Sequence, residues 1–383
     1  MIFQRALKLF PLQRSAFLFG PRMTGKTFLL RGLRADLRID LLDPELELQL
    51  KRSPSIFWEQ LSALDARALV VVDEVQRVPA LLDYVQKGIE EKQLTFILSG
   101  SSARKLKRGG ANLLGGRAKD LKLHPLTHEE LGPHFDIAEA CQFGTLPKVA
   151  QSLAARDQDE ARSLLRSYIT TYIKEEIQAE ALLRNIGAFQ RFLQVAAQGN
   201  AQVIEFANVS RECSVPSSTV KEYFSILEDT LLGDFLWPWD RSERKKARPK
   251  FYFFDCGVVR AIQNRLNDPP TPDEMGFLFE TWFVRELRRL RDYGEKPHEL
   301  SFWRQGNHEI DLVITGGHGP LLAIECKSGN DPISAQTVRA FRAIFPEVPL
   351  VIASLHDRVA RRLACGVDIL PWAQVIERYQ RLV

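Results

Sequence analysis

The chain has 383 residues, of which 45% are hydrophobic and 26% are charged, a composition typical of a globular protein with two or three domains. Its formal net charge of +4 is too small to identify a nucleic-acid partner, and its apolar runs are far shorter than the roughly 20 residues of a membrane-spanning helix. The five cysteines include no Cys-x-x-Cys pair, which argues against a zinc knuckle or a disulfide framework and favours a reducing, cytoplasmic location.

The first motif with a chemical meaning is a glycine-rich turn. Residues 15–31 read SAFLFGPRMTGKTFLLR, and residues 20–27 match G-x-x-x-x-G-K-[ST] between an expected strand and an expected helix. In this pattern backbone N–H groups bind phosphate oxygens, Lys26 places its charge on the β- and γ-phosphates, and Thr27 is a ligand of Mg²⁺. The stretch predicts a site for ATP and Mg²⁺ formed by Gly20, Pro21, Arg22, Met23, Thr24, Gly25, Lys26 and Thr27.

A second expected strand ends in two acids. Residues 68–76 read ALVVVDEVQ, and five consecutive apolar residues before Asp73 are typical of a buried parallel strand. At the carboxyl end of such a strand, Asp73 reaches the bound Mg²⁺, and Glu74 orients or deprotonates the attacking water. Together with the phosphate-binding loop, these acids predict an ATPase.

The next expected strand, residues 94–98, ends at Ser99, a polar residue placed to sense the γ-phosphate. It is followed by RKLKRGGANLLGGRA, a stretch rich in arginine and glycine. We select Arg117 as a candidate arginine finger that reaches the ATP of a neighbouring subunit, with Arg104 as the alternative. A basic loop that only meets solvent is the other interpretation, and the run at 104–108 is also a candidate pore loop.

Five motifs carry a resemblance to a known family. In chain order, GPRMTGKT, VVVDEVQ, LSGSS, LLGGRA and FGTLPK resemble the bacterial and archaeal AAA+ ATPases that have a long C-terminal domain of originally unknown function. The resemblance covers nearly the whole chain. It implies that Ser99 is a sensor residue and that Gly144 and Pro147, in a Gly-x-x-Pro turn, contact adenine. A finger supplied in trans further implies an oligomer, in the form of a ring such as a hexamer.

The middle of the chain reads as helices followed by a winged helix. Residues 157–198 have helical periodicity, and residues 204–235 read as a helix-turn-helix, after which two strand-like runs enclose the basic run 241–250. Winged helices also bind proteins, and charged runs are most often solvated, so both interpretations stay open. The candidate DNA-binding residues are Ser218, Thr219 and Lys221 at the exposed start of the second helix, and Arg244, Lys245, Lys246, Arg248 and Lys250 in the wing.

The last third of the chain places acids on a helix and on a hairpin. The helix 275–291 carries Glu280 on its apolar face, one strand carries Asp311, and the next carries Glu325 and Lys327, which face the same side. This arrangement resembles the PD-(D/E)XK nuclease core, in which carboxylates hold Mg²⁺ and the lysine positions a water. It implies a second metal site at Glu280, Asp311 and Glu325 with Lys327. A satisfied buried ion-pair cluster is the other interpretation.

The sequence therefore predicts an α/β chain in four parts. These are an AAA+ P-loop ATPase core (1–135), a helical lid and linker (136–198), a winged helix-turn-helix (199–250) and a C-terminal PD-(D/E)XK-like α/β domain (251–383). The predicted function is an ATP- and Mg²⁺-dependent helicase or translocase that acts on forked or branched DNA. An ATP-regulated nuclease and a signalling or scaffold ATPase are the alternatives.

Overall fold

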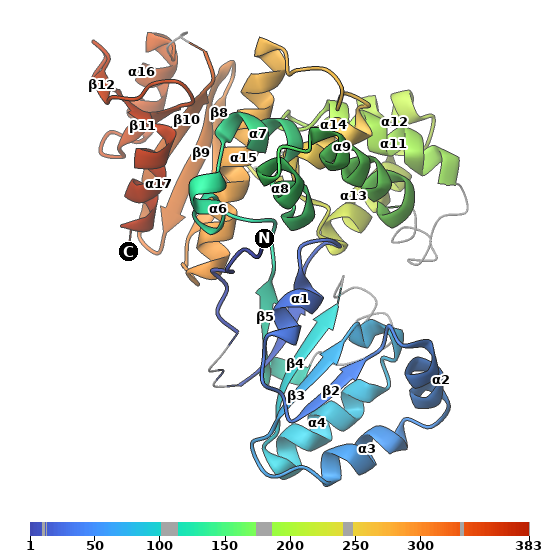
Figure 1. Cartoon of the computed structure of the whole chain (residues 1–383). Coiled ribbons are helices and arrows are strands. Elements are labelled where there is room, and N and C mark those ends of the chain that lie inside the picture. The colour runs from blue at the N-terminus through green and yellow to red at the C-terminus, as the bar shows by residue number, and fades with distance from the viewer. Residues whose placement is uncertain are drawn as a thin grey trace. The chain divides into compact units, whose positions relative to one another are not determined.

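The computed structural model describes residues 1–9, 12, 14–100, 114–173, 186–239, 248–329 and 333–382, without the side chains of residues 172 and 173. The chain divides into two compact units (Figure 1). The N-terminal unit consists of Ile2–Leu126 with Ile226–Leu232, and the C-terminal unit consists of Met1, Thr127–Ser225 and Gly233–Val383. In the described ranges, no helix is both long enough and apolar enough to cross a lipid bilayer.

The N-terminal unit is built on a parallel sheet with the strand order β2-β3-β4-β1-β5. Its strands β1 and β3 are buried along their whole length, which explains their nearly continuous apolar sequences. Because β4 lies between β1 and β3, the loop after β1 and the acids after β3 are one strand apart at the same edge of the sheet. The strands are β1 (Ser15–Phe19), β2 (Leu37–Asp40), β3 (Leu69–Asp73), β4 (Thr95–Gly100) and β5 (Ala118–Lys122).

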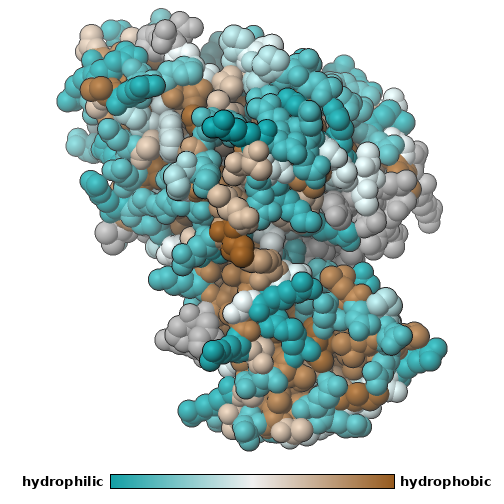
Figure 2. All heavy atoms as spheres, in the orientation of Figure 1, coloured by the Kyte–Doolittle hydropathy of each residue, from teal (hydrophilic) through white to brown (hydrophobic). Residues whose placement is uncertain are grey.

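Helices cover this sheet, and Figure 1 shows α3 and α4 along one of its faces. Phe57 of α3 and Leu81 of α4 pack in one hydrophobic core with Phe17, Val70 and Val72 of the strands. Hydrophobic surface is visible on this unit in Figure 2, and its exposed large apolar residues include Phe28, Leu42 and Leu48. The helical elements are α1 (Lys26–Arg31), α2 (Pro44–Arg52), α3 (Ser55–Ser62), η1 (Val75–Arg77), α4 (Leu81–Lys92) and η2 (Leu114–Gly116).

The C-terminal unit begins with helices. The described part of the segment predicted as lid and linker is helical, and its α7 and α9 pack against α14 (Cys256–Ile262) in the same unit. The predicted boundaries of the four parts stay predictions. The helical elements before the first strand of this unit are α6 (His128–Leu131), η3 (Gly132–His134), α7 (Ile137–Phe143), α8 (Pro147–Ala154), α9 (Gln158–Ser167), η4 (Tyr168–Ile173), α11 (Ile186–Gln198), α12 (Phe206–Cys213) and α13 (Ser217–Asp229), which starts in this unit.

A turn and a strand pair follow the order expected of a winged helix. Ser214 ends α12 in the left-handed region with φ 55°, which turns the chain into α13. The strands β6 (Gly233–Leu236) and β7 (Lys250–Phe253) then pair antiparallel. Residues 240–247 between them lie outside the described residues, and the winged-helix assignment stays a prediction.

A mixed sheet with the order β12-β13-β11-β10-β9-β8 forms the rest of the unit. The strands β8, β9 and β10 form an antiparallel meander, and β10, β11 and β13 run parallel to one another. Leu312 and Ile324 face α15 and α17, whereas Val313 and Ala323 face α16, so both faces of the sheet are covered. The elements are α15 (Pro272–Tyr293), β8 (Glu299–Gln305), β9 (His308–Gly316), β10 (Gly319–Lys327), α16 (Ala335–Ile344), β11 (Leu350–Ser354), β12 (Arg361–Arg362), β13 (Asp368–Pro371) and α17 (Trp372–Gln380).

The long helix α15 carries buried charged residues along its length. The guanidinium of Arg285 binds the carboxylate of Asp234 at 2.6 Å. Glu286 accepts the backbone N–H of His128 at 2.8 Å and lies 2.6 Å from its ring Nδ1. These partners, together with those of Glu280, fix the rotation of α15 about its axis.

Candidate functional site

The glycine-rich loop after β1 folds around the side chain of Lys26. The ammonium of Lys26 donates to the carbonyl oxygens of Gly20 at 2.6 Å and of Pro21 at 3.1 Å, and the hydroxyl of Thr24 donates to Pro21 at 2.8 Å. Gly25 has φ 93°, a left-handed conformation that favours glycine. The loop therefore presents a buried cation, Lys26, in a turn stabilised by its own backbone.

The first and last parts of the N-terminal unit hold this loop in place. A Cβ atom at Gly20 would lie 2.4 Å from the carbonyl oxygen of Leu123, just after β5, so only glycine fits there. Arg5 donates to the carbonyl oxygens of Thr24 and of His124, each at 2.7 Å. Sequence analysis did not identify Arg5 as part of the site, because its partners lie 19 and 119 residues away.

The ends of β3 and β4 bring Asp73, Glu74 and Ser99 together. The buried hydroxyl of Ser99 donates to Oδ1 of Asp73 and accepts the backbone N–H of Glu74 at 3.1 Å. Glu74 has φ 59° and ψ 44°, a left-handed conformation that costs a non-glycine residue about 1 kcal/mol. The amide of Gln76, a residue that sequence analysis did not identify, donates to Oε2 of Glu74. Ser99 thus holds the backbone of Glu74, and Gln76 holds its carboxylate.

Arg117, the candidate arginine finger, is exposed at the start of the segment that leads into β5. Its guanidinium lies 2.9 Å from Oε1 of Glu90, which is also exposed. Its role in a neighbouring subunit stays a prediction. The alternative, Arg104, and the basic run 104–108 lie outside the described residues.

Of the two residues predicted to contact adenine, Gly144 ends α7 and Pro147 begins α8 in the C-terminal unit. Gly144 has φ 73°, and a Cβ atom there would lie 1.9 Å from Oδ1 of Asp255. The backbone N–H of Thr145 donates to Oδ2 of Asp255 at 2.8 Å. The close approach of this carboxylate accounts for a glycine at position 144, and contact with adenine stays a prediction.

The candidate DNA-binding residues on α13 lie at its start, as predicted. Ser218 and Lys221 are exposed and Thr219 is half-buried, while the Lys221 ammonium lies 5.6 Å from the centre of the Phe206 ring. Arg248 is exposed and forms an ion pair with Glu205. The other candidates in the wing, Arg244, Lys245 and Lys246, lie outside the described residues. Their contact with DNA stays a prediction.

In the C-terminal unit, the four residues predicted to form a nuclease-like site do come together. Glu280 from α15, Asp311 from β9 and Glu325 from β10 are all buried. Lys327 lies 3.0 Å from Oε1 of Glu325, and Oδ2 of Asp311 accepts the backbone N–H of Cys326 at 2.9 Å. We call Glu280, Glu309, Asp311 and Glu325 the carboxylate cluster.

The carboxylate cluster contains a cation that sequence analysis placed elsewhere. The ammonium of Lys250 lies 2.8 Å from Glu280 Oε1, 2.7 Å from Glu309 Oε1 and 3.3 Å from Asp311 Oδ1. Its exposed fraction is only 3%, so the expectation that Lys250 neutralises DNA phosphates is wrong. Tyr252 donates to Glu280 Oε1 at 2.5 Å. Side chains alternate between the two faces of a strand, so Lys250 and Tyr252 share one face of β7. This alternation is the sequence feature that could have indicated the contact.

Burial dominates the electrostatics of the cluster. Burial, and then the charge of Asp311, raise the pKa of Glu280 to about 7 and the pKa of Glu325 to about 8, although Lys250 and Lys327 oppose these rises. Burial lowers the pKa of Lys250, but Glu280 and the other acidic groups around it outweigh this effect and raise it well above its usual value. Lys250 is therefore an ammonium ion at neutral pH. Among the described residues, no group of three or more His, Cys, Asp or Glu side chains is arranged to hold a metal ion.

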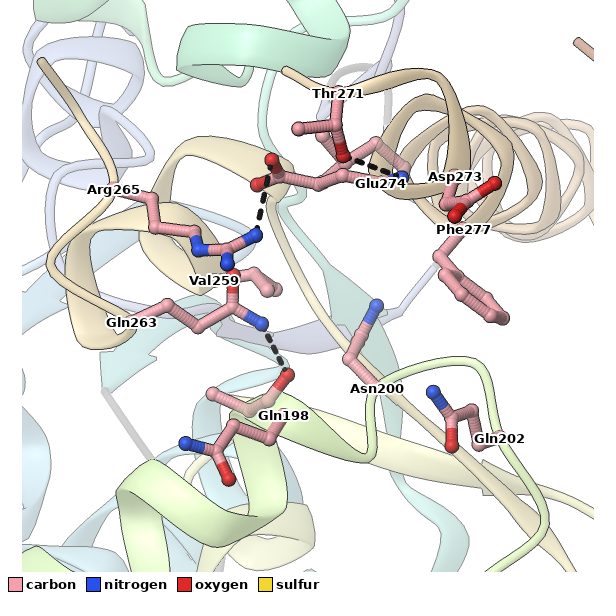
Figure 3. A pocket seen from close by; sticks show the side chains of 12 residues that line it. Gln198, Asn200, Gln202, Val259, Gln263, Arg265, Thr271, Asp273, Glu274 and Phe277 are labelled. Atoms are coloured by element: carbon pink, nitrogen blue, oxygen red, sulfur yellow. Dashed lines mark hydrogen bonds and ion pairs between the residues drawn. The ribbon is translucent and has the colours of Figure 1, made fainter. Parts of the chain in front are cut away.

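A separate cavity of about 380 Å³ lies in the same unit, between the end of α11, α14 and the start of α15 (Figure 3). Gln263 donates to the carbonyl oxygen of Ala197 at 2.7 Å, and Arg265 lies 3.4 Å from Glu274. The N–H of Glu274 donates to the hydroxyl of Thr271 at 3.3 Å. None of the predicted site residues lines this cavity, so it does not coincide with either candidate site.

Three family models match successive parts of the chain. Residues 13–132 match the AAA domain, residues 134–268 match a domain of unknown function (DUF8612), and residues 275–375 match another domain of unknown function (DUF4143). Among curated proteins, no sequence matches this chain. The AAA match, with the parallel sheet and the glycine-rich loop, confirms the prediction of a P-loop AAA ATPase domain in the N-terminal unit.

The solved structures that match this chain include two proteins of low sequence identity. The Orc1 protein of Aeropyrum pernix, in complex with DNA, is 13% identical, with 68% of this chain and 88% of that chain covered and a TM-score of 0.31. A DNA polymerase III gamma subunit-related protein of Thermotoga maritima is 14% identical, with 72% and 95% covered and a TM-score of 0.25. At TM-scores this low, neither likeness supports a conclusion about this chain.

Proposed function

We propose that this chain, whose residues 13–132 match the AAA domain, hydrolyses ATP with Mg²⁺ and uses the cycle to separate or move along strands of forked or branched DNA. The observation that supports the ATPase is the convergence of Lys26, the two acids after β3 and Ser99 at one edge of a parallel sheet. In open α/β sheets, ligands bind at the carboxyl ends of the strands.

The donor groups at this edge fit ATP and Mg²⁺. Lys26 supplies a cation for phosphate oxygens, and Thr27 and Asp73 supply the hard oxygen ligands that Mg²⁺ prefers. One protein carboxylate is enough, because Mg²⁺ in such sites takes its remaining ligands from phosphates and water. When bound there, Mg²⁺ neutralises charge that develops on the β- and γ-phosphate oxygens.

The chain's own residues then have distinct roles. Glu74 accepts a proton from the attacking water or orients it, and Gln76 holds the Glu74 carboxylate. Ser99 binds both Asp73 and the backbone of Glu74 and so keeps the two acids in register. In our proposal Arg117 completes the site of a neighbouring subunit, which makes the active form an oligomer, in the shape of a ring.

DNA contact is assigned to the segment that follows α12. Ser218 and Lys221 are exposed at the start of α13, where recognition helices meet DNA. The sequence RSERKKARP at 241–249, which follows α13 and β6 in the chain, adds positive charge, and positive charge is the electrostatic requirement for binding phosphates without sequence preference.

One experiment tests both the motor and its alternatives. The chain is incubated with ATP, Mg²⁺ and labelled forked DNA, and strand separation, fragment length and phosphate release are followed together. We expect separated strands of full length, ATP hydrolysis that rises with DNA, and loss of both in Lys26→Ala. Reversal of the charges of Arg244, Lys245 and Lys246 is expected to remove the stimulation by DNA and to keep basal hydrolysis. Hydrolysis that is indifferent to DNA would instead support a signalling or scaffold ATPase.

A second candidate is an ATP-regulated nuclease. The observation that favours it is the meeting of Glu280, Asp311, Glu325 and Lys327 on one helix and one hairpin. In the same assay a nuclease would produce shortened strands, and Lys327→Ala would abolish the shortening while it leaves ATP hydrolysis intact.

A further inference from the structure

The carboxylate cluster poses a problem of charge. Glu280, Asp311 and Glu325 are buried, Glu309 is half-buried, and they come from α15, β9 and β10. Buried carboxylates are costly unless a cation or hydrogen-bond donors compensate them. A divalent metal ion and a lysine ammonium are two kinds of cation that meet this need.

Lys250 occupies the position of the cation. Its ammonium reaches carboxylates from two elements, Glu280 on α15 and both Glu309 and Asp311 on β9, at 2.7 to 3.3 Å. Tyr252, two residues along β7, adds a hydroxyl to the same oxygen of Glu280. An ammonium has three donor hydrogens, and these match the three carboxylate oxygens around Lys250, so all of its donors are satisfied.

We infer that Lys250 is the resident cation of the carboxylate cluster and that it keeps a divalent metal ion out. Mg²⁺ and Mn²⁺ bind carboxylate oxygens at distances near 2 Å and cannot share those oxygens with an ammonium at the same position. The arrangement of the described residues agrees, because no three His, Cys, Asp or Glu side chains among them are placed around a metal. The cluster therefore differs from a metal-dependent active site, although it has the acids of one, and this inference counts against the second candidate function, the nuclease.

A second observation concerns a carboxyl oxygen of the cluster that no protein group binds. Oε2 of Glu325 is buried and makes no hydrogen bond, while Oε1 of the same carboxylate binds Lys327. A buried carboxyl oxygen without a protein partner is open to a proton or to a cation. We therefore infer that removal of the Lys250 ammonium turns the cluster into a site for a divalent cation.

The inference is tested by Mn²⁺ binding to the full chain without nucleotide or DNA, so that failure of the proposed motor activity does not affect it. Bound Mn²⁺ is counted by electron paramagnetic resonance in the wild type, Asp311→Asn, Lys250→Met and the double variant. We expect equal binding in the wild type and Asp311→Asn. We expect Lys250→Met to bind about one additional ion per chain and the double variant to lose that ion again. We also expect the Tm of Lys250→Met to rise with Mn²⁺.

The chain offers a matched control in Lys327, the second ammonium at the cluster. Lys327 is partly exposed and pairs with Glu325 at the edge of the set, so Lys327→Met is expected to create no additional Mn²⁺ site. A wild-type Mn²⁺ site that Asp311→Asn removes would overturn the inference, as would a folded Lys250→Met that binds no additional ion. If Lys250→Met does not fold, the comparison of the wild type with Asp311→Asn still decides whether the cluster holds a metal.

Discussion

The hydroxyl of Ser99 donates a hydrogen bond to Asp73, and the same oxygen accepts the backbone N–H of the next residue, Glu74. Ser99 lies on β4, whereas Asp73 is the last residue of the neighbouring parallel strand β3 and Glu74 follows it directly. A single hydroxyl therefore links the expected metal ligand to the residue expected to act on water. The position of both acids depends on a side chain from another strand.

Replacement of this hydroxyl tests the link. We expect Ser99→Ala to lower kcat for ATP by about tenfold or more, because both acids lose the group that positions them. The variant also leaves buried Asp73 without one of its donors, at a cost of about 1–3 kcal/mol in the free energy of unfolding. Steady-state phosphate release and urea unfolding measure the two effects. Thr95→Val, at the other end of β4, is the control, and an equal loss of activity there would contradict the assignment.

Gly100 gives a test of Gln76 that does not alter any polar group. A Cβ atom at Gly100 would lie 2.6 Å from Oε1 of Gln76, the residue that holds Glu74. Gly100→Ala is therefore expected to displace Gln76 and to lower kcat about tenfold, the same loss that we expect for Gln76→Ala, with little change in KM. Gly32→Ala is the matched control, because its Cβ would meet no atom closer than 3.4 Å. Normal turnover in Gly100→Ala would mean that Gln76 does not position Glu74.

The arginine finger is tested by mixing two inactive variants. Arg117→Ala lacks the finger and Lys26→Ala lacks the phosphate ligand, so a mixed oligomer regains intact sites where a neighbour supplies Arg117. We expect ATP hydrolysis of the mixture to exceed that of either variant. Glu90→Gln is the control: its ion pair with Arg117 is exposed, and such pairs contribute about 0–1 kcal/mol. A mixture no more active than its components would place Arg117 outside the neighbour's site.

The carboxylate cluster predicts a pH dependence of stability. The pKa of Glu325, about 8 in the folded chain, is above its ordinary value of 4.5, so the native state binds more protons than the unfolded state. The resulting stabilisation is complete below about pH 4.5 and is lost as the pH rises through about 8. We expect Glu325→Gln to reduce the decrease of the free energy of unfolding with rising pH. At pH 9 its free energy of unfolding should exceed that of the wild type by on the order of 1–3 kcal/mol.

Urea unfolding with EDTA across this pH range measures the effect. Glu347→Gln, which removes the same charge from an exposed position of the same unit, is the control and should leave the slope unchanged. A slope that Glu325→Gln does not alter would show that Glu325 titrates alike in both states.

Substitution of Gly144 distinguishes a structural role of this residue from contact with adenine. Gly144→Ala would place Cβ 1.9 Å from Asp255 at φ 73°, and we expect a loss of more than about 2 kcal/mol in the free energy of unfolding. Gly132→Ala, at φ 54° with no atom within 4 Å of the built Cβ, isolates the cost of the backbone conformation. If Gly144→Ala keeps its stability and raises the KM for ATP instead, the residue contacts adenine.

The parts of the fold that sequence reasoning could predict are those with local patterns. The phosphate-binding loop and the strand before Asp73 each lie within about ten consecutive residues, and both were placed correctly. Lys250 was misassigned because its partners, 30 and 61 residues further on, leave no mark near it, whereas its neighbours in the chain are basic. The contacts of Arg5 depend in the same way on the path of the whole chain.

The helix α15 carries Glu280, Arg285 and Glu286, whose partners lie in three separate segments of the C-terminal unit. A slip of α15 by one residue would rotate these side chains by about 100° and separate all three from their partners at once. Intermediate positions of the helix would leave charges buried without compensation, which disfavours them. The three segments consequently dock or detach together, and local loosening at any one of them is resisted by the other two.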